Sequence, residues 1–129
     1  MKILITFSVF LLLHVIAWFA THAWMNSHPK EIVVVVDTSY SMKNHFADMQ
    51  EWLSDYVESG RYSKVVVGTD KEVLGDYESL RSSDVVFRTA FGKFSQQSLS
   101  RYDNIESDQR ILLSDGTVRP KGWQVVEFN

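Results

Sequence analysis

The feature that most constrains the fold is a run of five apolar residues, Ile32–Val36, which is followed at once by Asp37. Successive side chains of a strand point to opposite faces of a sheet, so an all-apolar strand is suited to burial on both faces. Strands of this kind are typical of parallel sheets that are flanked by helices. The run therefore favours an α/β fold.

Strand-like and helix-like segments alternate along the rest of the domain. One helix is indicated by apolar residues at helical spacing before Gly60, namely Phe46, Met49, Leu53, Tyr56 and Val57. A second helix is expected over Phe94–Tyr102, and Asp84–Thr89 fits either a strand or a loop. Further strands are predicted at Lys64–Thr69, Lys71–Gly75, Arg110–Gly116 and Trp123–Phe128. Of these, Lys71–Gly75 would be a short edge strand. This alternation predicts a mostly parallel sheet flanked by helices.

The N-terminal segment has a different character from the rest of the chain. Ile3–Trp24 is 22 residues long and contains no Asp, Glu, Lys or Arg. A helix that spans a bilayer needs about 20 apolar residues. Trp18 and Trp24 lie toward the end of the segment, where aromatic side chains favour the membrane interface. We therefore expect a membrane anchor over residues 1–27, a linker over 28–31 and a folded domain over 32–129.

A cleaved signal peptide is the alternative for the same segment, since Thr21-His22-Ala23 would pass as a cleavage site. The apolar core of a signal peptide is roughly 7–15 residues long, which is shorter than this segment. Lys2 and the N-terminal amine lie on one side of the segment, and Lys30 lies beside Glu31 on the other. This distribution favours a single-pass protein with its C-terminal domain outside the cytoplasm.

The charge of the domain argues against nucleic acid as a ligand. The whole chain has 13 Lys and Arg residues and 16 Asp and Glu residues. Lys2 is the one charged residue before Lys30, so the domain contains the other 12 basic residues and all 16 acidic ones. The domain is therefore mildly acidic and has no basic run, whereas nucleic-acid-binding proteins carry basic patches. The chain has no cysteine, which fits either side of a membrane.

Two of the predicted strands end in an aspartate, Asp37 in the first and Asp115 in the later one. In open α/β sheets the ligand site lies beyond the carboxyl ends of the strands, so the two carboxylates are expected at one edge. Neighbouring carboxylates repel each other, and a bound cation would relieve that repulsion. Ser39 and Ser41 can point back over Asp37 and add hydroxyl oxygens. An all-oxygen site suits Mg²⁺, Mn²⁺ or Ca²⁺ and does not suit zinc.

The same residues resemble a known family. D-T-S-Y-S at Asp37–Ser41 is similar to the metal-ion-dependent adhesion site of von Willebrand factor A (vWA) domains. In that family D-x-S-x-S follows a first strand, a threonine lies in a later loop, and an aspartate, often in T-D-G, follows a fourth strand. L-L-S-D-G matches the last part at Asp115. F-R-T-A-F-G-K-F resembles the family's G-G-T-D-F loop at Thr89 and Phe91, without its glycines and its aspartate.

The resemblance spans about residues 31–128 and implies a compact vWA-like domain with a Rossmann-like sheet. It implies three direct metal ligands, Ser39, Ser41 and Thr89. It implies two carboxylates that act largely through water, Asp37 and Asp115. The alternatives to Thr89 are Ser95 and Ser98. It further implies a metal-dependent protein–protein interaction, in which the partner donates an acidic side chain to the metal.

Other interpretations of the motif stay open. Ser41 could simply cap a helix, and Asp115-Gly116 could be a plain turn. The domain could then be a metal-free structural membrane protein. Asp37 could also be the nucleophile of a phosphotransferase of the haloacid dehalogenase type. Those enzymes carry an acidic residue where this chain has Ser39. They also need a lysine near the site, and Lys93 is the only candidate here. The sequence therefore favours a binding module over an enzyme.

Overall fold

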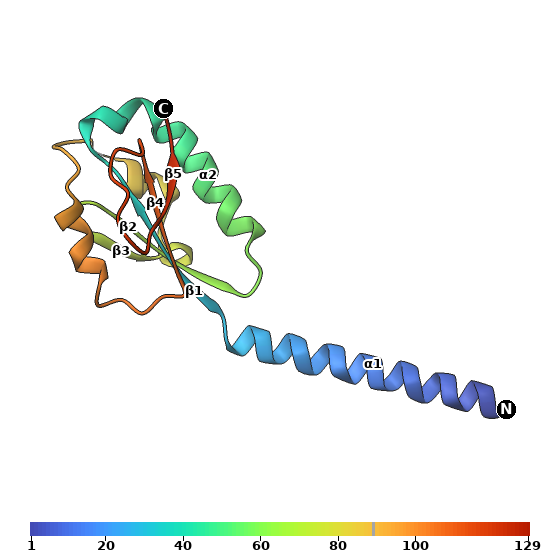
Figure 1. Cartoon of the computed structure of the whole chain (residues 1–129). Coiled ribbons are helices and arrows are strands. Elements are labelled where there is room, and N and C mark those ends of the chain that lie inside the picture. The colour runs from blue at the N-terminus through green and yellow to red at the C-terminus, as the bar shows by residue number, and fades with distance from the viewer. Residues whose placement is uncertain (89) are drawn as a thin grey trace.

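The computed structural model describes residues 1–88 and 90–129 as a long N-terminal helix that projects from an α/β domain (Figure 1). The helices and strands are, in chain order, α1 (Lys2–Ser27), β1 (Lys30–Val36), the 3₁₀ helix η1 (Tyr40–His45), α2 (Phe46–Ser59), β2 (Ser63–Thr69), β3 (Val73–Asp76), the 3₁₀ helices η2 (Tyr77–Ser79), η3 (Ser83–Phe87) and η4 (Gln96–Tyr102), β4 (Gln109–Ser114) and β5 (Gln124–Glu127).

The five strands form one mixed sheet in the order β3-β2-β1-β4-β5. β1 lies between β2 and β4 and is parallel to both, and β5 is parallel to β4. β3 is antiparallel to β2 and forms one edge. The predicted α/β class is therefore confirmed, with one antiparallel edge strand in an otherwise parallel sheet. The helix expected over Phe94–Tyr102 is a 3₁₀ helix, and the ambiguous segment after Asp84 lies partly in η3.

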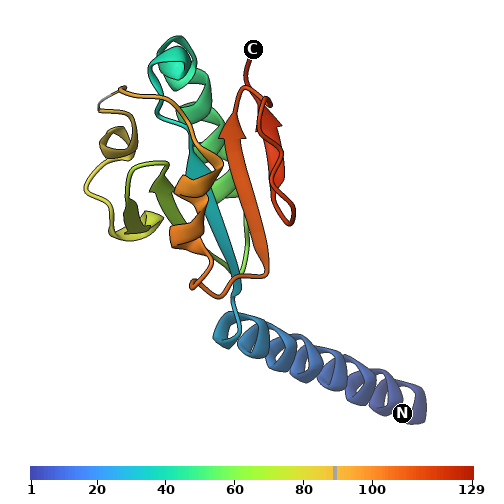
Figure 2. The ribbon, with the colours of Figure 1, turned by 60° about the vertical axis from the view of Figure 1, so that its left-hand side comes forward.

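The two faces of the sheet are covered by different elements, as Figure 2 shows with α2 on one side and the orange η4 segment on the other. Ile32, Val34 and Val36 of β1 pack in the same cluster as Met49 and Leu53 of α2. The intervening residues of β1 pack with η4 instead, and those are Val33 and Val35. All five residues of the apolar run are buried, which confirms the prediction of a strand covered on both faces.

A close contact holds η4 against β2. The phenol of Tyr102 lies over Gly68, where a Cβ atom would come within 2.0 Å of the tyrosine oxygen. The Tyr102 hydroxyl donates to the carbonyl oxygen of Thr69 at 2.6 Å. Glycine is therefore required in β2 at this point, because any side chain would displace the aromatic ring.

The helix α1 has 26 residues, none of them buried, and contains an 18-residue window with a mean hydropathy of 2.4, so its length and composition suit a membrane span. A signal sequence can have the same length and composition. The retention of α1 and the side of the membrane on which the domain lies are therefore predictions. β1 begins at Lys30, within the predicted linker, so only His28 and Pro29 separate α1 from the sheet. The His22 ring of α1 bonds to the Tyr62 hydroxyl of the domain. The domain therefore lies directly at the end of α1.

Candidate metal centre

The strand order reverses between β1 and β4. The chain passes from β1 to β2 and β3 on one side, and then returns to β4 on the other side of β1. In open α/β sheets, ligands bind at such a reversal, beyond the carboxyl ends of the strands. Asp37 directly follows β1 and Asp115 directly follows β4. The two aspartates predicted from the sequence therefore flank this position.

Asp37 is buried, with 3% of its surface exposed. Its backbone N–H donates to the carbonyl oxygen of Leu113 at 2.9 Å, which continues the pairing of β1 with β4. Its carboxylate oxygen Oδ1 accepts a hydrogen bond from the backbone N–H of Ser39 at 2.9 Å. This local bond turns the chain out of the strand. Burial raises the pKa of the Asp37 carboxyl, and the charges of Asp70 and Asp115 raise it further.

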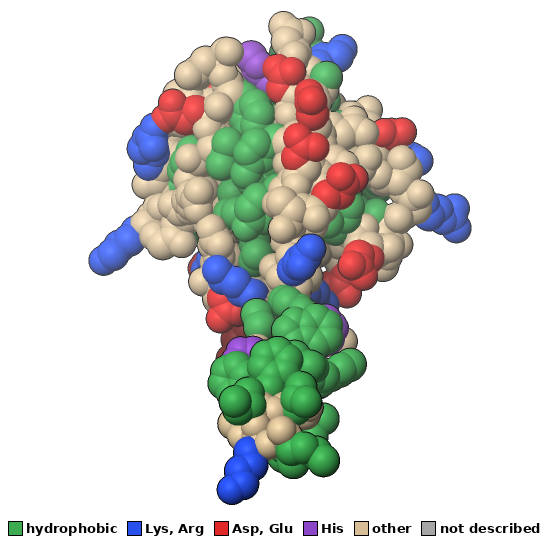
Figure 3. All heavy atoms as spheres, turned by 90° about the vertical axis from the view of Figure 1, so that its right-hand side faces the viewer, with side chains coloured by type: hydrophobic (Ala, Val, Ile, Leu, Met, Phe, Trp, Pro, Cys, Tyr) green, Lys and Arg blue, Asp and Glu red, His purple; other side chains and the backbone are tan. Residues whose placement is uncertain are grey.

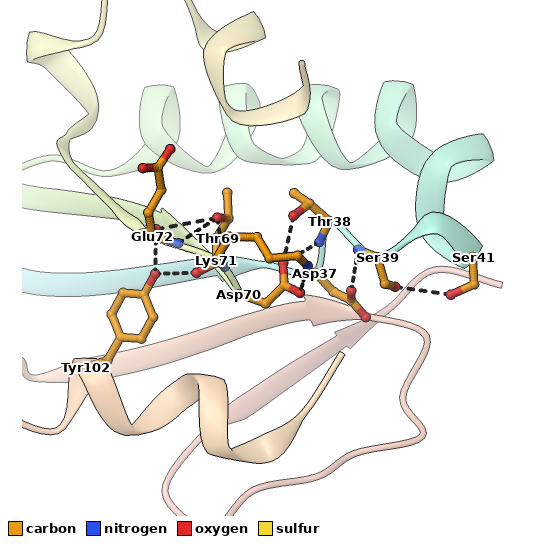
Figure 4. Close-up of polar contacts among 9 residues, drawn as sticks. All are labelled: Asp37, Thr38, Ser39, Ser41, Thr69, Asp70, Lys71, Glu72 and Tyr102. Carbon is orange, nitrogen blue, oxygen red and sulfur yellow. Dashed lines mark hydrogen bonds and ion pairs between the residues drawn. The ribbon is translucent and has the colours of Figure 1, made fainter. Parts of the chain in front are cut away.

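The hydroxyls of Ser39 and Ser41 lie together beside this carboxylate. Their Oγ atoms are 3.1 Å apart, and Figure 4 shows the two side chains extending from the same stretch of the loop. Two adjacent ligands of an octahedral Mg²⁺ ion would lie about 3 Å apart, given metal–oxygen distances of about 2.0–2.1 Å. Ser39 is buried and Ser41 is exposed, so the pair reaches from the interior to the solvent. This spacing suits two ligands of one hard cation.

The helix-cap interpretation of Ser41 is wrong. Ser41 lies inside η1, and neither η1 nor α2 has a side-chain hydrogen bond at its N-terminal cap. The caps of the two helices are Ser39 and His45. The only described side-chain hydrogen bond of the Ser41 hydroxyl joins it to Ser39. Capping therefore does not explain the second serine of the motif.

Asp115 lies in a turn and is only half-buried. Its Oδ1 atom accepts hydrogen bonds from the backbone N–H of Thr117 at 3.0 Å and from the Thr117 hydroxyl at 2.7 Å. These bonds hold the pKa of the Asp115 carboxyl below its usual range. Gly116 follows with a φ angle of +80°, which glycine adopts readily. Asp115-Gly116 is thus a turn that also brings a charge into the range of Asp37.

The predicted middle ligand, Thr89, lies outside the described residues. The chain just beyond it is held against the D-x-S-x-S loop by two backbone hydrogen bonds. Phe91 donates to the carbonyl oxygen of Thr38 at 3.1 Å, and Tyr40 donates to that of Gly92 at 3.2 Å. The two alternatives to Thr89 lie at the start of η4, where Ser95 accepts from the N–H of Gln97 and Ser98 lies within the helix.

Asp70 is a third aspartate at this edge and was not among the site residues predicted from the sequence. It directly follows β2 and is almost fully buried. Its Oδ1 atom accepts from the backbone N–H of Thr38 at 2.9 Å and from the Thr38 hydroxyl at 2.7 Å. Its Oδ2 atom pairs with the ammonium group of Lys71 (Figure 4). The signal was available, because V-V-V-G-T-D repeats the pattern of an apolar strand that ends in an aspartate.

The three aspartates differ in how their charge is balanced. Asp70 has Lys71 as its counterion. Among the described residues, no Lys, Arg or His forms an ion pair with Asp37 or Asp115. Within the same residues, no group of three or more His, Cys, Asp and Glu side chains lies close enough to hold a metal ion. A cation at this edge would therefore depend on the serine hydroxyls as well as on carboxylates.

A cleft of about 410 Å³ opens beside this edge of the sheet. Its lining includes Thr38 of the D-x-S-x-S loop, the basic side chains of Lys71 and Arg88, and Phe91. The Lys71 ammonium also lies 4.9 Å from the centre of the Phe91 ring. Glu72 also lines the cleft, so it combines charged side chains of both signs with an exposed aromatic ring, next to the D-x-S-x-S loop.

Comparisons of the chain with protein-family models, with curated proteins and with solved structures found no match.

Proposed function

We propose that the domain is a compact vWA-like module that binds a divalent cation at the carboxyl edge of its sheet and uses it to bind a protein partner. The proposed metal-site residues are Asp37, Ser39, Ser41, Thr89 and Asp115. The preferred ion is Mg²⁺, with Mn²⁺ or Ca²⁺ as alternatives. The observation that carries the proposal is the pair of serine hydroxyls 3.1 Å apart beside a buried aspartate that has no described counterion.

Electrostatics supports the cation. Leaving a carboxylate buried without a counterion is unfavourable, and two further acidic groups make the position of Asp37 more negative. Lys71 already neutralises Asp70, so the remaining negative charge belongs to Asp37 and Asp115. A bound divalent cation would stabilise both ionised carboxylates and would supply an open coordination position for a carboxylate oxygen of the partner.

The cleft beside the motif supports an acidic partner. Arg88 contributes a positive charge to its lining, which also contains Glu72, and a positive charge attracts an acidic segment and orients it during approach. Phe91 is 52% exposed and offers an apolar contact next to that charge. The strand order β3-β2-β1-β4-β5 supports a Rossmann-like sheet, since doubly wound folds use this order.

The proposed role is binding and not catalysis. A phosphotransferase with Asp37 as nucleophile would need an acid two residues on, and that position is Ser39. It would also need a lysine beside Asp37 that is available to the substrate. Lys71 is instead paired with Asp70, and Lys93 is exposed to solvent. A metal-free structural role is the better-supported second candidate, because the serine hydroxyls bond to each other and Asp37 accepts a backbone N–H.

We further propose that α1 anchors the module in a membrane as a single span, with the domain outside the cytoplasm. The partner would then lie close to the same membrane, because only His28 and Pro29 separate α1 from β1.

Thermal unfolding of the full chain in detergent tests the metal site. The protein is compared in metal-stripped buffer and with saturating Mg²⁺ or Mn²⁺, for the wild type and a Ser39→Ala, Ser41→Ala double variant. A cation at 100 times its dissociation constant should stabilise the wild type by about 2.7 kcal/mol, which is roughly 10 °C or more for a domain of this size. The double variant should show no rise, and Ser100→Ala on η4 should respond as the wild type does.

Equal stabilisation of the double variant and the wild type would mean that the cation binds elsewhere. The absence of any rise with Mg²⁺, Mn²⁺ or, added as a third ion, Ca²⁺, in a wild type that unfolds cooperatively, would favour the metal-free structural role.

A further inference from the structure

An apolar stripe lies between α2 and β5, on the far side of the sheet from η4. It consists of four half-buried residues that pack against the edge of the core, Trp52 and Tyr56 from α2 and Val126 and Phe128 at β5. The rings of Trp52 and Tyr56 are stacked with their centres 4.9 Å apart. In Figure 3 hydrophobic side chains form a continuous vertical band across this face of the domain.

The stripe exists because this part of the sheet has a strand without a covering helix. Parallel strands normally carry helices on both faces. Within residues 1–88 and 90–129, α2 is the one α-helix that packs on the sheet, and it contacts β1 residues at its centre. Trp123, at the end of the connection from β4 to β5, packs on the opposite face against Tyr102. Val126 and Phe128 therefore mark the place where a second helix would lie beside α2.

Acidic side chains border the stripe. Four exposed acids recur on α2 every three or four residues, which places them along one side of the helix, and these are Asp48, Glu51, Asp55 and Glu58. Acidic groups lie in a column next to the hydrophobic band in Figure 3. The sequence of α2 contains no Lys, Arg or His. None of the four acids forms an ion pair with a described residue.

We propose that this stripe binds an amphipathic helix of a partner protein, whose apolar face covers Trp52, Val126 and Phe128 and whose Lys or Arg residues face the acidic side of α2. A helix is the occupant because it would complete the layer that α2 begins. Basic residues follow from charge complementarity with the four acids. A second copy of this chain is disfavoured, because a two-fold contact would bring the acidic sides of both α2 helices together. This surface is separate from the proposed metal site and requires no metal.

Site-specific photo-crosslinking tests this proposal in the membranes in which the full chain occurs. The photoreactive residue p-benzoylphenylalanine replaces Phe128, an aromatic position in the stripe. The matched control carries the same residue in place of Tyr77, a half-buried aromatic residue of η2 near the opposite edge of the sheet. The cross-linked peptide is sequenced by mass spectrometry. The expected product at position 128 joins a partner segment with apolar residues at helical spacing and Lys or Arg along one side, and the product is absent from the control.

Charge reversal provides the second measurement. A Glu51→Lys, Asp55→Lys double variant should lower the yield at position 128 by about tenfold, corresponding to about 1.4 kcal/mol. The exposed acids Glu78 and Glu106, changed to Lys together, should leave it unchanged. Chelation of divalent cations should also leave it unchanged, which separates this surface from the metal site.

Cross-links at position 128 to a second copy of this chain, to lipid alone, or to a segment without the apolar and basic pattern would overturn the proposal. So would the absence of any product, or a yield that is insensitive to the reversal on α2.

Discussion

The side chain of Asp37 is buried at the end of β1, and burial together with the charges of Asp70 and Asp115 raises its pKa. A carboxyl group whose folded-state pKa is raised contributes most to stability while protonated, below its unfolded pKa. That contribution is lost as the pH rises through the folded pKa. At neutral pH and without metal, the ionised Asp37 therefore opposes folding. With a cation bound at the proposed site, the same charge would favour the fold.

Asp37→Asn is therefore expected to raise the melting temperature of the metal-free full chain at neutral pH. The difference from the wild type should vanish below about pH 4, where an unfolded carboxyl is protonated. Saturating Mg²⁺ should reverse the order, because the wild type alone gains the full stabilisation. Melting curves from pH 3 to 8 in metal-stripped buffer, with and without Mg²⁺, measure both effects.

Asp115→Asn should change stability in the opposite direction to Asp37→Asn, because the Thr117 hydrogen bonds lower the pKa of Asp115. The ionised Asp115 stabilises the fold at neutral pH, and that contribution is lost as the pH falls through the folded pKa. Asp115→Asn should therefore lower the neutral melting temperature. An Asp37→Asn protein that is less stable than the wild type at pH 7 without metal would contradict the assignment of burial as the dominant effect.

At the scale of elements, η4 packs on its face of the sheet through Leu99 and Tyr102, and the Tyr102 hydroxyl adds hydrogen bonds to this contact. It donates to the carbonyl oxygens of Thr69 at 2.6 Å and Glu72 at 3.1 Å, at the point where β2 turns toward β3. Burial raises the pKa of Tyr102, so the hydroxyl stays protonated and able to donate. The hydroxyl of Tyr102 thus links η4 to the end of β2 and to the turn before β3.

Tyr102→Phe should lower the free energy of unfolding by roughly 1–2 kcal/mol, because buried carbonyl oxygens lose their donor while the ring still fills its place. Hydrogen exchange should quicken in η4 and at the end of β2 and should change less in α2. Tyr77→Phe is the matched control, since no hydrogen bond of its hydroxyl is found among the described residues. Equal losses in the two variants would argue that the Tyr102 bond contributes nothing specific.

At the scale of the whole molecule, α1 and the domain meet with almost no linker. With α1 as the proposed membrane anchor, its orientation would decide which compartment the proposed metal site faces. The chain has no cysteine, and single cysteines can therefore report sidedness without background. Ser100 is exposed on η4, and Lys2 lies at the other end of α1.

Ser100→Cys should react with a membrane-impermeant maleimide in intact cells, and Lys2→Cys should react only after the membrane is opened. This result follows from the basic N-terminal end remaining in the cytoplasm. The intact mass of the purified protein tests cleavage after Ala23 in the same preparation. The opposite labelling pattern would place the domain in the cytoplasm, and a mass without α1 would replace the anchor by a signal peptide.

The sequence by itself determined the fold class and part of the candidate site. Ile32–Val36 predicted a strand buried on both faces, because five adjacent apolar side chains leave neither face suited to water. Apolar spacing predicted α2, which depends on local periodicity alone. Asp37 and Asp115 were placed at one edge of the sheet because each directly follows a strand, and the charge of Asp115 does raise the pKa of Asp37.

Only the tertiary structure decided the rest, because these features depend on pairs of residues far apart in the chain. The pairing of Asp70 with Thr38 requires β2 to lie beside β1, and the sequence does not state strand order. The packing of η4 on β2, where the Tyr102 ring closes over Gly68, likewise joins residues far apart in the chain. The apolar stripe beside α2 is visible only once β5 is known to be an edge strand without a helix above it. Local patterns fix which residues are buried, whereas the order of the strands decides which of them meet.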